Sequence, residues 1–194
     1  MIRVERLTGD ALARALPEVA RLRIAVFRAF PYLYDGDAAY EERYLQVYRE
    51  SEDAILVGAY DGARLVGAAT GTPMEDHAGD FGAAFAGTGI ALERIFYCAE
   101  SVLLPEYRGQ GVGHRFFDLR EAQARALGRE FTAFCAVIRP GDHPARPEGY
   151  QPLDAFWRKR GYAPVEGAVA RFGWKEIGAA DECAHDLQFW MRAL

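Results

Sequence analysis

The sequence has few cysteines, no excess of positive charge and no long hydrophobic run, and each of these absences excludes a class of protein. Its three cysteines, Cys98, Cys135 and Cys183, are odd in number and form no C-x-x-C pair. That pattern argues against a disulfide framework and against a zinc ribbon. No apolar run reaches membrane-spanning length, and the N-terminus MIRVERLTGD lacks the apolar core of a signal peptide. We therefore expect a cytoplasmic protein without a metal site or a membrane partner.

The charge balance is mildly acidic. The net charge is −5 at pH 7, with a pI near 5.4, so general electrostatic attraction to nucleic acid is not expected. The apolar fraction of 51% and the charged fraction of 26% are ordinary for a soluble globular protein. A chain of 194 residues is long enough to bury one core without a metal or disulfides, and we expect a single domain over residues 1–194.

The most informative stretch lies between residues 94 and 128. An extended apolar segment, Ile95–Leu104, is followed by the breaker Pro105 and by the glycine-rich sequence RGQGVG at residues 108–113. Glycines have no Cβ and let backbone N–H groups approach a ligand, and a helix that starts there adds its unpaired N–H groups and the positive end of its dipole. The order of strand, glycine loop and helix therefore predicts an anion site suited to phosphate.

The segment after the glycine loop predicts an amphipathic helix. Val112, Phe116, Leu119, Gln123 and Ala126 recur at steps of three and four residues and form a stripe that is interrupted once. We expect Arg115, Arg120, Glu121 and Arg125 to lie largely on the other faces, and Gly128 to end the helix.

Two familiar phosphate-binding motifs do not fit this loop. A Walker loop needs G-x-x-x-x-G-K-[ST], and no lysine stands here. A dinucleotide fingerprint needs a third glycine at the position of His114. Taken alone, RGQGVG is also compatible with a tight connection that binds nothing. The pattern that remains is R-x-x-G-x-G.

This pattern resembles the signature of the GNAT superfamily of acyl-CoA-dependent N-acyltransferases, [RQ]-x-x-G-x-[GA] directly after a strand. Arg108, Gly111 and Gly113 match it. A second stretch, Phe156–Tyr162, reads FWRKRGY and resembles the family's helix ending F-Y-x-x-x-G-[FY]. The two motifs stand in the expected order with a strand between them, and the resemblance covers roughly residues 54–194.

The resemblance implies a fold and a cofactor. The fold is an α/β (α+β) domain with a mixed, mostly antiparallel sheet of about six to seven strands, splayed at the cofactor strand and flanked by about four helices. The implied co-substrate is acetyl-CoA, and the implied partner is an amine acceptor. By position, the backbone N–H groups of Ser101, Val102 and Leu103 would bind the pantetheine and the thioester carbonyl. The pyrophosphate would bind to Arg108, Gly109, Gln110, Gly111, Val112, Gly113 and His114.

The remaining chain predicts the elements that such a fold needs. Strands are expected over residues 2–7, 54–60, 64–71, 95–104, 131–138, 168–174 and 187–191, and helices over 10–30, 38–50, 112–128 and 152–161. Asp61-Gly62 predicts a hairpin between the second and third strands. Residues 74–92 are expected to form a loop that includes a short helix at most. The apolar run Phe189–Met191 is either a contact in a homodimer or, as we prefer, an ordinary core strand.

Two loops are candidates for the walls of an acceptor pocket. In the loop PYLYDGD, Tyr32 and Tyr34 either line the pocket or pack the loop onto the domain, and its aspartates either attract an ammonium group or are solvated. A connection of about a dozen residues after Arg139 has a length typical of functional loops. We expect Arg139 and His143 in it to face the acceptor. The sequence leaves a free amino acid or its derivative, a polyamine, an aminoglycoside and a protein N-terminus open as acceptors.

Acyl transfer to an amine needs a base, stabilisation of the developing oxyanion and a route for protonating the thiolate. We expect Glu100 to be the base, because it lies in an apolar strand beside the implied thioester, where burial favours proton uptake. The alternative is a structural carboxylate paired with an arginine, and Glu93 is a second candidate base. The family's usual acid, a tyrosine, is replaced by Trp157, whose indole does not release its proton at neutral pH. The acid is then Tyr150 or a water, or the thiolate leaves unassisted.

The leading hypothesis is an N-acetyltransferase that moves an acetyl group from acetyl-CoA to a primary amine of a small molecule by direct attack on the thioester. The alternative, motivated by Trp157, is a GNAT-like module that binds acyl-CoA as a sensor or structural partner without efficient catalysis. A nucleotide-binding protein of another fold is disfavoured by the two motifs that do not fit.

Overall fold

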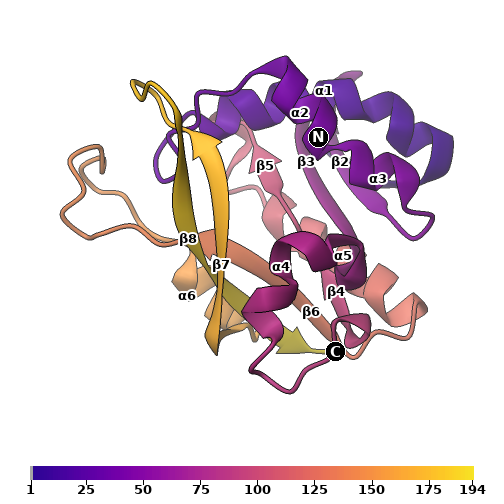
Figure 1. Cartoon of the computed structure of the whole chain (residues 1–194). Coiled ribbons are helices and arrows are strands. Elements are labelled where there is room, and N and C mark those ends of the chain that lie inside the picture. Colours follow the sequence, from indigo (N-terminus) through magenta and orange to yellow (C-terminus); the bar gives the residue numbers. More distant parts are fainter. Residues whose placement is uncertain (1) are drawn as a thin grey trace.

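A computed structural model describes residues 2–194 and shows one eight-stranded sheet with helices on both faces (Figure 1). The strands are β1 (Arg3–Leu7), β2 (Ile55–Asp61), β3 (Arg64–Pro73), β4 (Ile95–Tyr97), β5 (Ser101–Leu103), β6 (Phe131–Val137), β7 (Ala163–Lys175) and β8 (Glu182–Ala193). The α-helices are α1 (Gly9–Phe27), α2 (Ala38–Tyr44), α3 (Gln46–Glu50), α4 (Ala78–Phe85), α5 (Val112–Ala126) and α6 (Asp154–Lys159). The 3₁₀ turns are η1 (Met74–His77), η2 (Leu92–Arg94) and η3 (Pro105–Tyr107).

The strand order is β1-β2-β3-β4-β6-β8-β7, and β5 pairs with β3. All strand pairs are antiparallel except β4 with β6. The predicted mixed, mostly antiparallel sheet is therefore confirmed, and so is the hairpin at Asp61-Gly62, which joins β2 to β3.

Alternation along β2 and β3 gives the sheet two apolar faces, because successive side chains of a strand point to opposite sides. Val57 and Val66 pack in one core cluster with Phe116 of α5. Their neighbours on the other face, such as Leu56, pack in a second cluster with Leu12 of α1. Each such buried side chain contributes about 1.5–3 kcal/mol to stability. The two helices thus cover opposite faces of the same strands.

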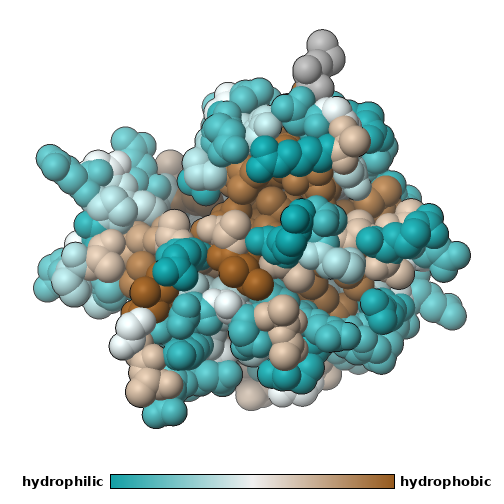
Figure 2. Space-filling view, turned by 90° about the horizontal axis from the view of Figure 1, so that it is seen from above, coloured by the Kyte–Doolittle hydropathy of each residue, from teal (hydrophilic) through white to brown (hydrophobic). Residues whose placement is uncertain are grey.

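The side of the molecule that carries α1, α2 and α3 is seen from above in Figure 2. Hydrophobic residues are visible near its centre, surrounded by hydrophilic side chains. Leu12, Leu16, Val19 and Leu22 of α1 are buried, and the same stripe ends in Arg23, which is also buried. A buried guanidinium needs partners, and those partners lie in the candidate site.

The prediction of one continuous strand over residues 95–104 is wrong. The segment changes neighbours at its middle: Cys98 N donates to Ala133 O at 2.7 Å, on the β6 side, whereas Ala99 N donates to Thr70 O at 3.1 Å, on the β3 side. β4 therefore pairs with both β3 and β6, and β5 pairs with β3 alone in the described chain. The sheet consequently splays between β5 and β6, as the family resemblance implies.

Other expected elements differ in their bounds. The helix predicted over residues 38–50 is divided at Leu45 into α2 and α3, and α4 is the short helix expected within residues 74–92. β7 starts at Ala163 instead of residue 168. Pro164 and Gly167 interrupt the strand pattern in the sequence, and the β7–β8 register shifts between Pro164 and Val169. Figure 1 shows the resulting long β7–β8 hairpin.

The C-terminal apolar run is a core strand. Phe189 and Trp190 lie in β8 and are buried within the chain, with 0% and 4% of their surface exposed. None of the helices in residues 2–194 combines the length and the apolar character needed to cross a membrane. In the same residues, no group of three His, Cys, Asp or Glu side chains is placed to hold a metal ion.

Candidate functional site

The glycine loop before α5 has an open backbone in a conformation that favours glycine. Gly109 and Gly111 have φ angles of 75° and 79°, in the left-handed region that L side chains rarely adopt. A Cβ added at either position would meet no atom within 4 Å, so this side of the loop is open. Intrahelical bonding in α5 starts with the N–H groups of His114 and Arg115, which both donate to Gly111 O. The N–H groups of the first helical residues are therefore available to an anion.

The second motif lies against the first. The ring of Phe156 in α6 is 4.9 Å from that of His114, and its Cζ is 3.7 Å from the position of a Cβ at Gly113. Arg160, just after α6, places Nη1 3.2 Å from His114 Nδ1 and donates through Nη2 to Asp118 at 2.8 Å. The fold thus brings the two sequence motifs together at the N-terminus of α5.

The edge of β5 that faces β6 is free of strand partners in the described residues. Glu100 O accepts from Thr70 N at 3.2 Å, Leu104 N donates to Val66 O at 3.0 Å, and Val102 lies opposite Ala68. Since backbone groups alternate in direction along an antiparallel strand, those of the intervening Ser101 and Leu103 point into the gap between β5 and β6.

The three residues predicted to contact the pantetheine therefore do not all face the gap. The backbone groups of Ser101 and Leu103 face the gap, whereas those of Val102 face β3. Ser101 is exposed although it lies in the interior of the sheet, which shows how wide the splay is. Arg108 Nε donates to Leu103 O at 3.3 Å and links the glycine loop to this strand. The free edge and the open loop are therefore continuous.

Arg120 of α5 is fixed beneath the point where the strand splays. Its side chain is buried, contrary to the prediction that it lies off the apolar stripe towards other faces. Nη1 donates to Thr70 O and Glu100 O, both at 3.2 Å, and Nη2 donates to Ser101 Oγ at 2.9 Å. The guanidinium satisfies backbone carbonyls near the change of strand partner, which explains why a charged side chain is buried there.

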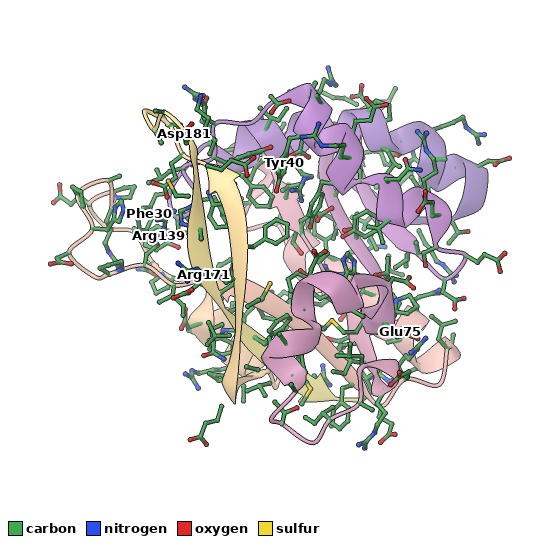
Figure 3. All side chains as sticks on the ribbon, viewed as in Figure 1. Phe30, Tyr40, Glu75, Arg139, Arg171 and Asp181 are labelled. Atoms are coloured by element: carbon green, nitrogen blue, oxygen red, sulfur yellow. The ribbon has the colours of Figure 1, made fainter. Side chains whose placement is uncertain are left out.

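A cavity of about 80 Å³ lies beside Glu100, at the end of β5 away from the glycine loop. Its walls include nine aromatic side chains: Phe27, Tyr32, Tyr34, Tyr40, Tyr44, Phe81, Tyr97, Phe172 and Trp174. Figure 3 shows Tyr40 beside the upper part of β7. Since α1, α2, α4, β4 and β7 all contribute rings, no local sequence pattern describes this cavity.

Three buried charged side chains meet at the cavity. Arg23 donates through Nε to Glu41 Oε2 at 2.5 Å and through Nη1 to Glu100 Oε2 at 2.8 Å. Only 6%, 0% and 6% of Arg23, Glu41 and Glu100, respectively, are exposed. Glu100 also accepts from Thr70 Oγ1 at 2.8 Å and from Tyr44 OH at 3.2 Å. With both carboxylates ionised the cluster carries a net charge of −1.

The buried surroundings shift the ionisation of these groups. Burial raises the pKa of Glu41, and the neighbouring Arg23 opposes that shift. Burial disfavours the charged form of Arg23, but Glu100, Tyr44 and Glu41 together hold its pKa well above the ordinary value. Burial also raises the pKa of Tyr44 well above its ordinary value, so its phenol keeps its proton at neutral pH. Arg23 is thus a permanent cation, and Tyr44 a permanent donor to Glu100.

The structure is compatible with both interpretations of Glu100. It is paired with an arginine, as the structural alternative predicts, and it also lines the cavity, as a base must. Glu93 lies in η2, before β4, where its side chain is exposed and is not part of the cavity. The role of either residue as a base stays a prediction.

The loop between α1 and α2 contributes to the cavity as one of the alternatives predicts. Tyr32 and Tyr34 both line it. Asp37 caps α2 by accepting from Tyr40 N at 3.0 Å, and Asp35 lies 3.6 Å from Lys175 Nζ. The tyrosines of this loop thus face the cavity, while the two carboxylates are engaged elsewhere.

The connection after β6 lies mostly outside the cavity and projects from the body of the molecule (Figure 1). Arg139 donates to the carbonyls of Pro31 at 2.7 Å and Tyr32 at 3.1 Å, so it holds the loop that carries the tyrosines. His143 Nδ1 accepts from Ala145 N at 3.1 Å, and the Tyr150 ring packs edge-on against Phe30 at 4.7 Å. Figure 3 shows Phe30 and Arg139 on this side of the hairpin. None of Arg139, His143 and Tyr150 is a lining residue of the cavity.

Trp157 of α6 packs in the core. Its ring centroid is 4.9 Å from that of Phe134 and 5.2 Å from that of Trp190. The residues that sequence reasoning missed, above all Arg23, Glu41 and Tyr44, come from α1 and α2. A single signal was available for them: Arg23 continues the buried stripe of α1, where an arginine implies a buried acidic partner.

Comparisons with known proteins agree with this geometry. A model of the acetyltransferase (GNAT) family matches residues 19–162. The fold is similar to that of a ribosomal-protein-alanine N-acetyltransferase from Brucella melitensis, with 14% identity and a TM-score of 0.61 over 100% of this chain and 99% of that one.

Two further solved structures are similar over 100% of this chain. One is a polyamine N-acetyltransferase from Drosophila melanogaster that forms N-acetylagmatine, with 13% identity, a TM-score of 0.59 and 100% of that chain covered. The other is a GNAT family acetyltransferase from Elizabethkingia anophelis with acetyl-CoA bound, with 13% identity, a TM-score of 0.53 and 98% of that chain covered. At such identities the likeness concerns the fold. No curated protein sequence matches the chain.

Proposed function

Because the chain belongs to the acetyltransferase (GNAT) family, we propose that it is an acetyl-CoA-dependent N-acetyltransferase that acts on a primary amine of a small molecule. One observation carries the proposal beyond the family. The buried carboxylate of Glu100 lines the aromatic cavity, and the next residue, Ser101, starts the free edge of β5. A base for the amine and backbone donors for the thioester are therefore consecutive in the chain.

The residues present fit acetyl-CoA. The open loop around Gly109 and Gly111, together with the N-terminus of α5, offers backbone N–H groups to the pyrophosphate. The free edge of β5 offers the backbone groups of Ser101 and the N–H of Leu103 to the amide-containing pantetheine arm, while Leu103 O accepts from Arg108. Acetyl-CoA supplies an activated acetyl group as a thioester. The backbone N–H groups at the splay stabilise negative charge on a carbonyl oxygen placed there.

Glu100 takes the proton that the amine must lose. In the cluster of Arg23, Glu41 and Glu100, two carboxylates face one guanidinium. With Glu41 ionised, a proton taken up by Glu100 leaves Arg23 and Glu41 as a neutral buried pair. Tyr44 and Thr70 hold the carboxylate in place through their hydroxyl groups.

The thiolate leaves without a side-chain acid. Trp157 packs against Phe134 and Trp190 and offers no ionisable proton. Tyr150 packs against Phe30 outside the cavity. A cysteine thiol has a pKa of about 8.5, and the alkyl thiolate of coenzyme A is likewise a far weaker base than an alkoxide, so it departs without prior protonation.

The second candidate function is an acyl-CoA-binding module without efficient catalysis. The observation that favours it is the same packing of Trp157, which leaves the family's usual acid position inert. Turnover distinguishes the two candidates, since both predict acetyl-CoA binding.

Calorimetric titration with acetyl-CoA, with NADH and ATP as controls, tests the first half of the proposal. Selective, saturable binding of acetyl-CoA is expected. Release of free thiol in the presence of amines tests the second half. Absence of acetyl-CoA binding by the folded protein contradicts both candidates, and binding without thiol release from any amine leaves the binding module.

A further inference from the structure

The cavity at Glu100 constrains the acceptor by its size. A water-sized group needs about 10–15 Å³ measured in the same way, so a cavity of about 80 Å³ holds on the order of six such groups. That is the size of a short chain or one ring, and because the cavity is partly open to solvent, the rest of a longer acceptor lies outside it. An aminoglycoside would leave most of its body outside, as would a protein N-terminus beyond its first residue.

The walls constrain the body of the acceptor. Among the lining residues of the described chain, Arg23 and Glu100 are the only charged ones, and most of the others are aromatic. Phe27, Phe81, Phe172 and Leu187 present no hydrogen-bonding group, and the tyrosines add one hydroxyl each, of which those of Tyr40 and Tyr44 already donate to Gly173 O and Glu100. A body with more polar groups than the remaining hydroxyls can pair costs free energy on burial, because its groups lose water without gaining partners. The cavity therefore favours a largely apolar body.

The charges constrain what else the acceptor carries. Arg23 already donates to two carboxyl groups, so a carboxylate on the acceptor would meet Glu100 without a free cation to balance it. Arg139 does not compensate, because it donates to Pro31 O and Tyr32 O outside the lining. A free amino acid is thus disfavoured.

A second ammonium group on the acceptor is disfavoured as well. Glu100 is the single carboxylate in the lining of the described cavity, and Glu41 is fully buried behind it. One ammonium pairs with Glu100, the acidic partner that this lining provides. A second one at the far end of the molecule would meet apolar side chains without an acidic partner.

We propose, on the basis of the N-acetyltransferase function above, that the acceptor is a small monoamine with an apolar, aromatic-sized body and no carboxylate, such as an arylalkylamine. Of the acceptor classes that the sequence leaves open, the structure thereby disfavours a free amino acid and a polyamine and favours an amino acid derivative that lacks the carboxylate. Glu100 recognises the amine, and the rings from α1, α2, α4 and β7 recognise the body.

Two matched pairs of amines test this inference in the thiol-release assay. Phenethylamine and phenylalanine differ only in the α-carboxylate, and hexylamine and 1,6-diaminohexane differ only in the second amino group. We expect kcat/KM to be at least 100-fold higher for phenethylamine than for phenylalanine, and at least 10-fold higher for hexylamine than for 1,6-diaminohexane. Equal or reversed preferences in either pair overturn the inference.

A substitution in the wall provides a second test. Phe172 lies in edge strand β7, is half-buried and lines the cavity, so a long side chain is tolerated there. Phe172→Arg supplies a cation for a carboxylate, and we expect the preference for phenethylamine over phenylalanine to fall at least 10-fold. Phe172→Leu, the matched control, keeps the wall apolar and keeps the preference.

Calorimetry with acetyl-CoA on the same preparations distinguishes a wrong acceptor class from a wrong transferase function. If acetyl-CoA binds and phenylalanine or 1,6-diaminohexane is the better acceptor, the inference is overturned while the transferase function stands. If acetyl-CoA binds and none of the four amines is acetylated, the inference is likewise overturned. If acetyl-CoA does not bind, the proposed function itself is wrong.

Discussion

Arg120 Nη2 donates to Ser101 Oγ at 2.9 Å, which joins the middle of α5 to the first residue of β5. The same guanidinium binds Thr70 O and Glu100 O through Nη1. A single buried side chain thus connects the helix of the glycine loop, the free strand edge and the backbone of the proposed base. Residues in three different parts of the sequence are held in one geometry by it.

The first prediction concerns the buried hydrogen bonds of Arg120. Arg120→Lys keeps the charge but loses the planar fork of donors, so at least one buried carbonyl is left without a partner. We expect the free energy of unfolding to fall by about 2–4 kcal/mol, as measured by urea denaturation. Acetyl-CoA affinity should fall too, because Ser101 is released. Arg125→Lys, on the exposed side of the same helix, is the control and should change stability by about 0.5 kcal/mol or less.

The second prediction concerns the base. Glu100→Gln removes the proton acceptor but leaves Arg23 paired with Glu41, so the fold should persist. We expect kcat to fall by about 10²–10⁴-fold while the Kd for acetyl-CoA stays nearly unchanged, as measured by thiol release and calorimetry. Glu93→Gln should leave the rate unchanged. An unaltered rate in Glu100→Gln would remove Glu100 from the catalytic role and leave it as a structural partner of Arg23.

Glu100 illustrates which part of the candidate site could be predicted from the sequence. A carboxylate inside an apolar strand is a visible anomaly, and its position beside the implied thioester follows from the family motif. Its partner Arg23 stands 77 residues earlier in the chain, and no local pattern connects the two. The pair is created by the packing of α1 on the sheet, which periodicity predicts only as a helix with a buried face.

The glycine loop was predictable for the opposite reason, since its requirement is local. A backbone with φ near 75° at Gly109 and Gly111 is encoded by the glycines themselves. Arg120 was misplaced because an arginine on a helix is normally solvated, and the carbonyls that it satisfies exist only where the strand changes partners. The aromatic cavity could not be predicted from the sequence, because five separate elements and the loop between α1 and α2 supply its rings.

The third prediction concerns the glycine loop. Gly111→Ala adds a methyl group that meets no neighbour within 4 Å but must adopt a φ of 79°. We expect a loss of about 1–2 kcal/mol in stability from the left-handed backbone. We also expect acetyl-CoA to bind at least about 10-fold more weakly, since the methyl group stands on the open side that the pyrophosphate would approach.

Gly62→Ala is the matched control for this substitution. Gly62 also has a positive φ, of 58°, and open space around its Cβ, but it lies in the β2–β3 hairpin. The two variants should lose similar stability in thermal unfolding, and only Gly111→Ala should lose acetyl-CoA affinity in calorimetry. Equal affinities in both variants would show that the loop does not hold the cofactor.

The last prediction concerns pH. His77 is buried among the rings of Tyr48, Phe81 and Tyr97, and its Nε2 has no hydrogen-bond partner in the described residues. Burial lowers the pKa of His77 below its ordinary value of 6.5, and Asp80, 3.9 Å away, opposes the shift only in part. Between the two pKa values the unfolded chain binds more protons than the folded one, so stability rises with pH across that window.

The stability supplied by a neutral His77 is therefore complete above pH 6.5 and is lost as the pH falls through the lowered pKa. The slope is at most about 1.4 kcal/mol per pH unit for this one group. His77→Phe keeps an aromatic ring in the same aromatic cluster but removes the titrating imidazole. The urea midpoint of this variant should therefore depend less on pH between about 6.5 and 5 than that of the unmodified chain. His143→Gln, outside the core, should retain the original slope. A slope that His77→Phe does not reduce would mean that His77 is already protonated in the folded protein, paired with Asp80 in spite of its burial.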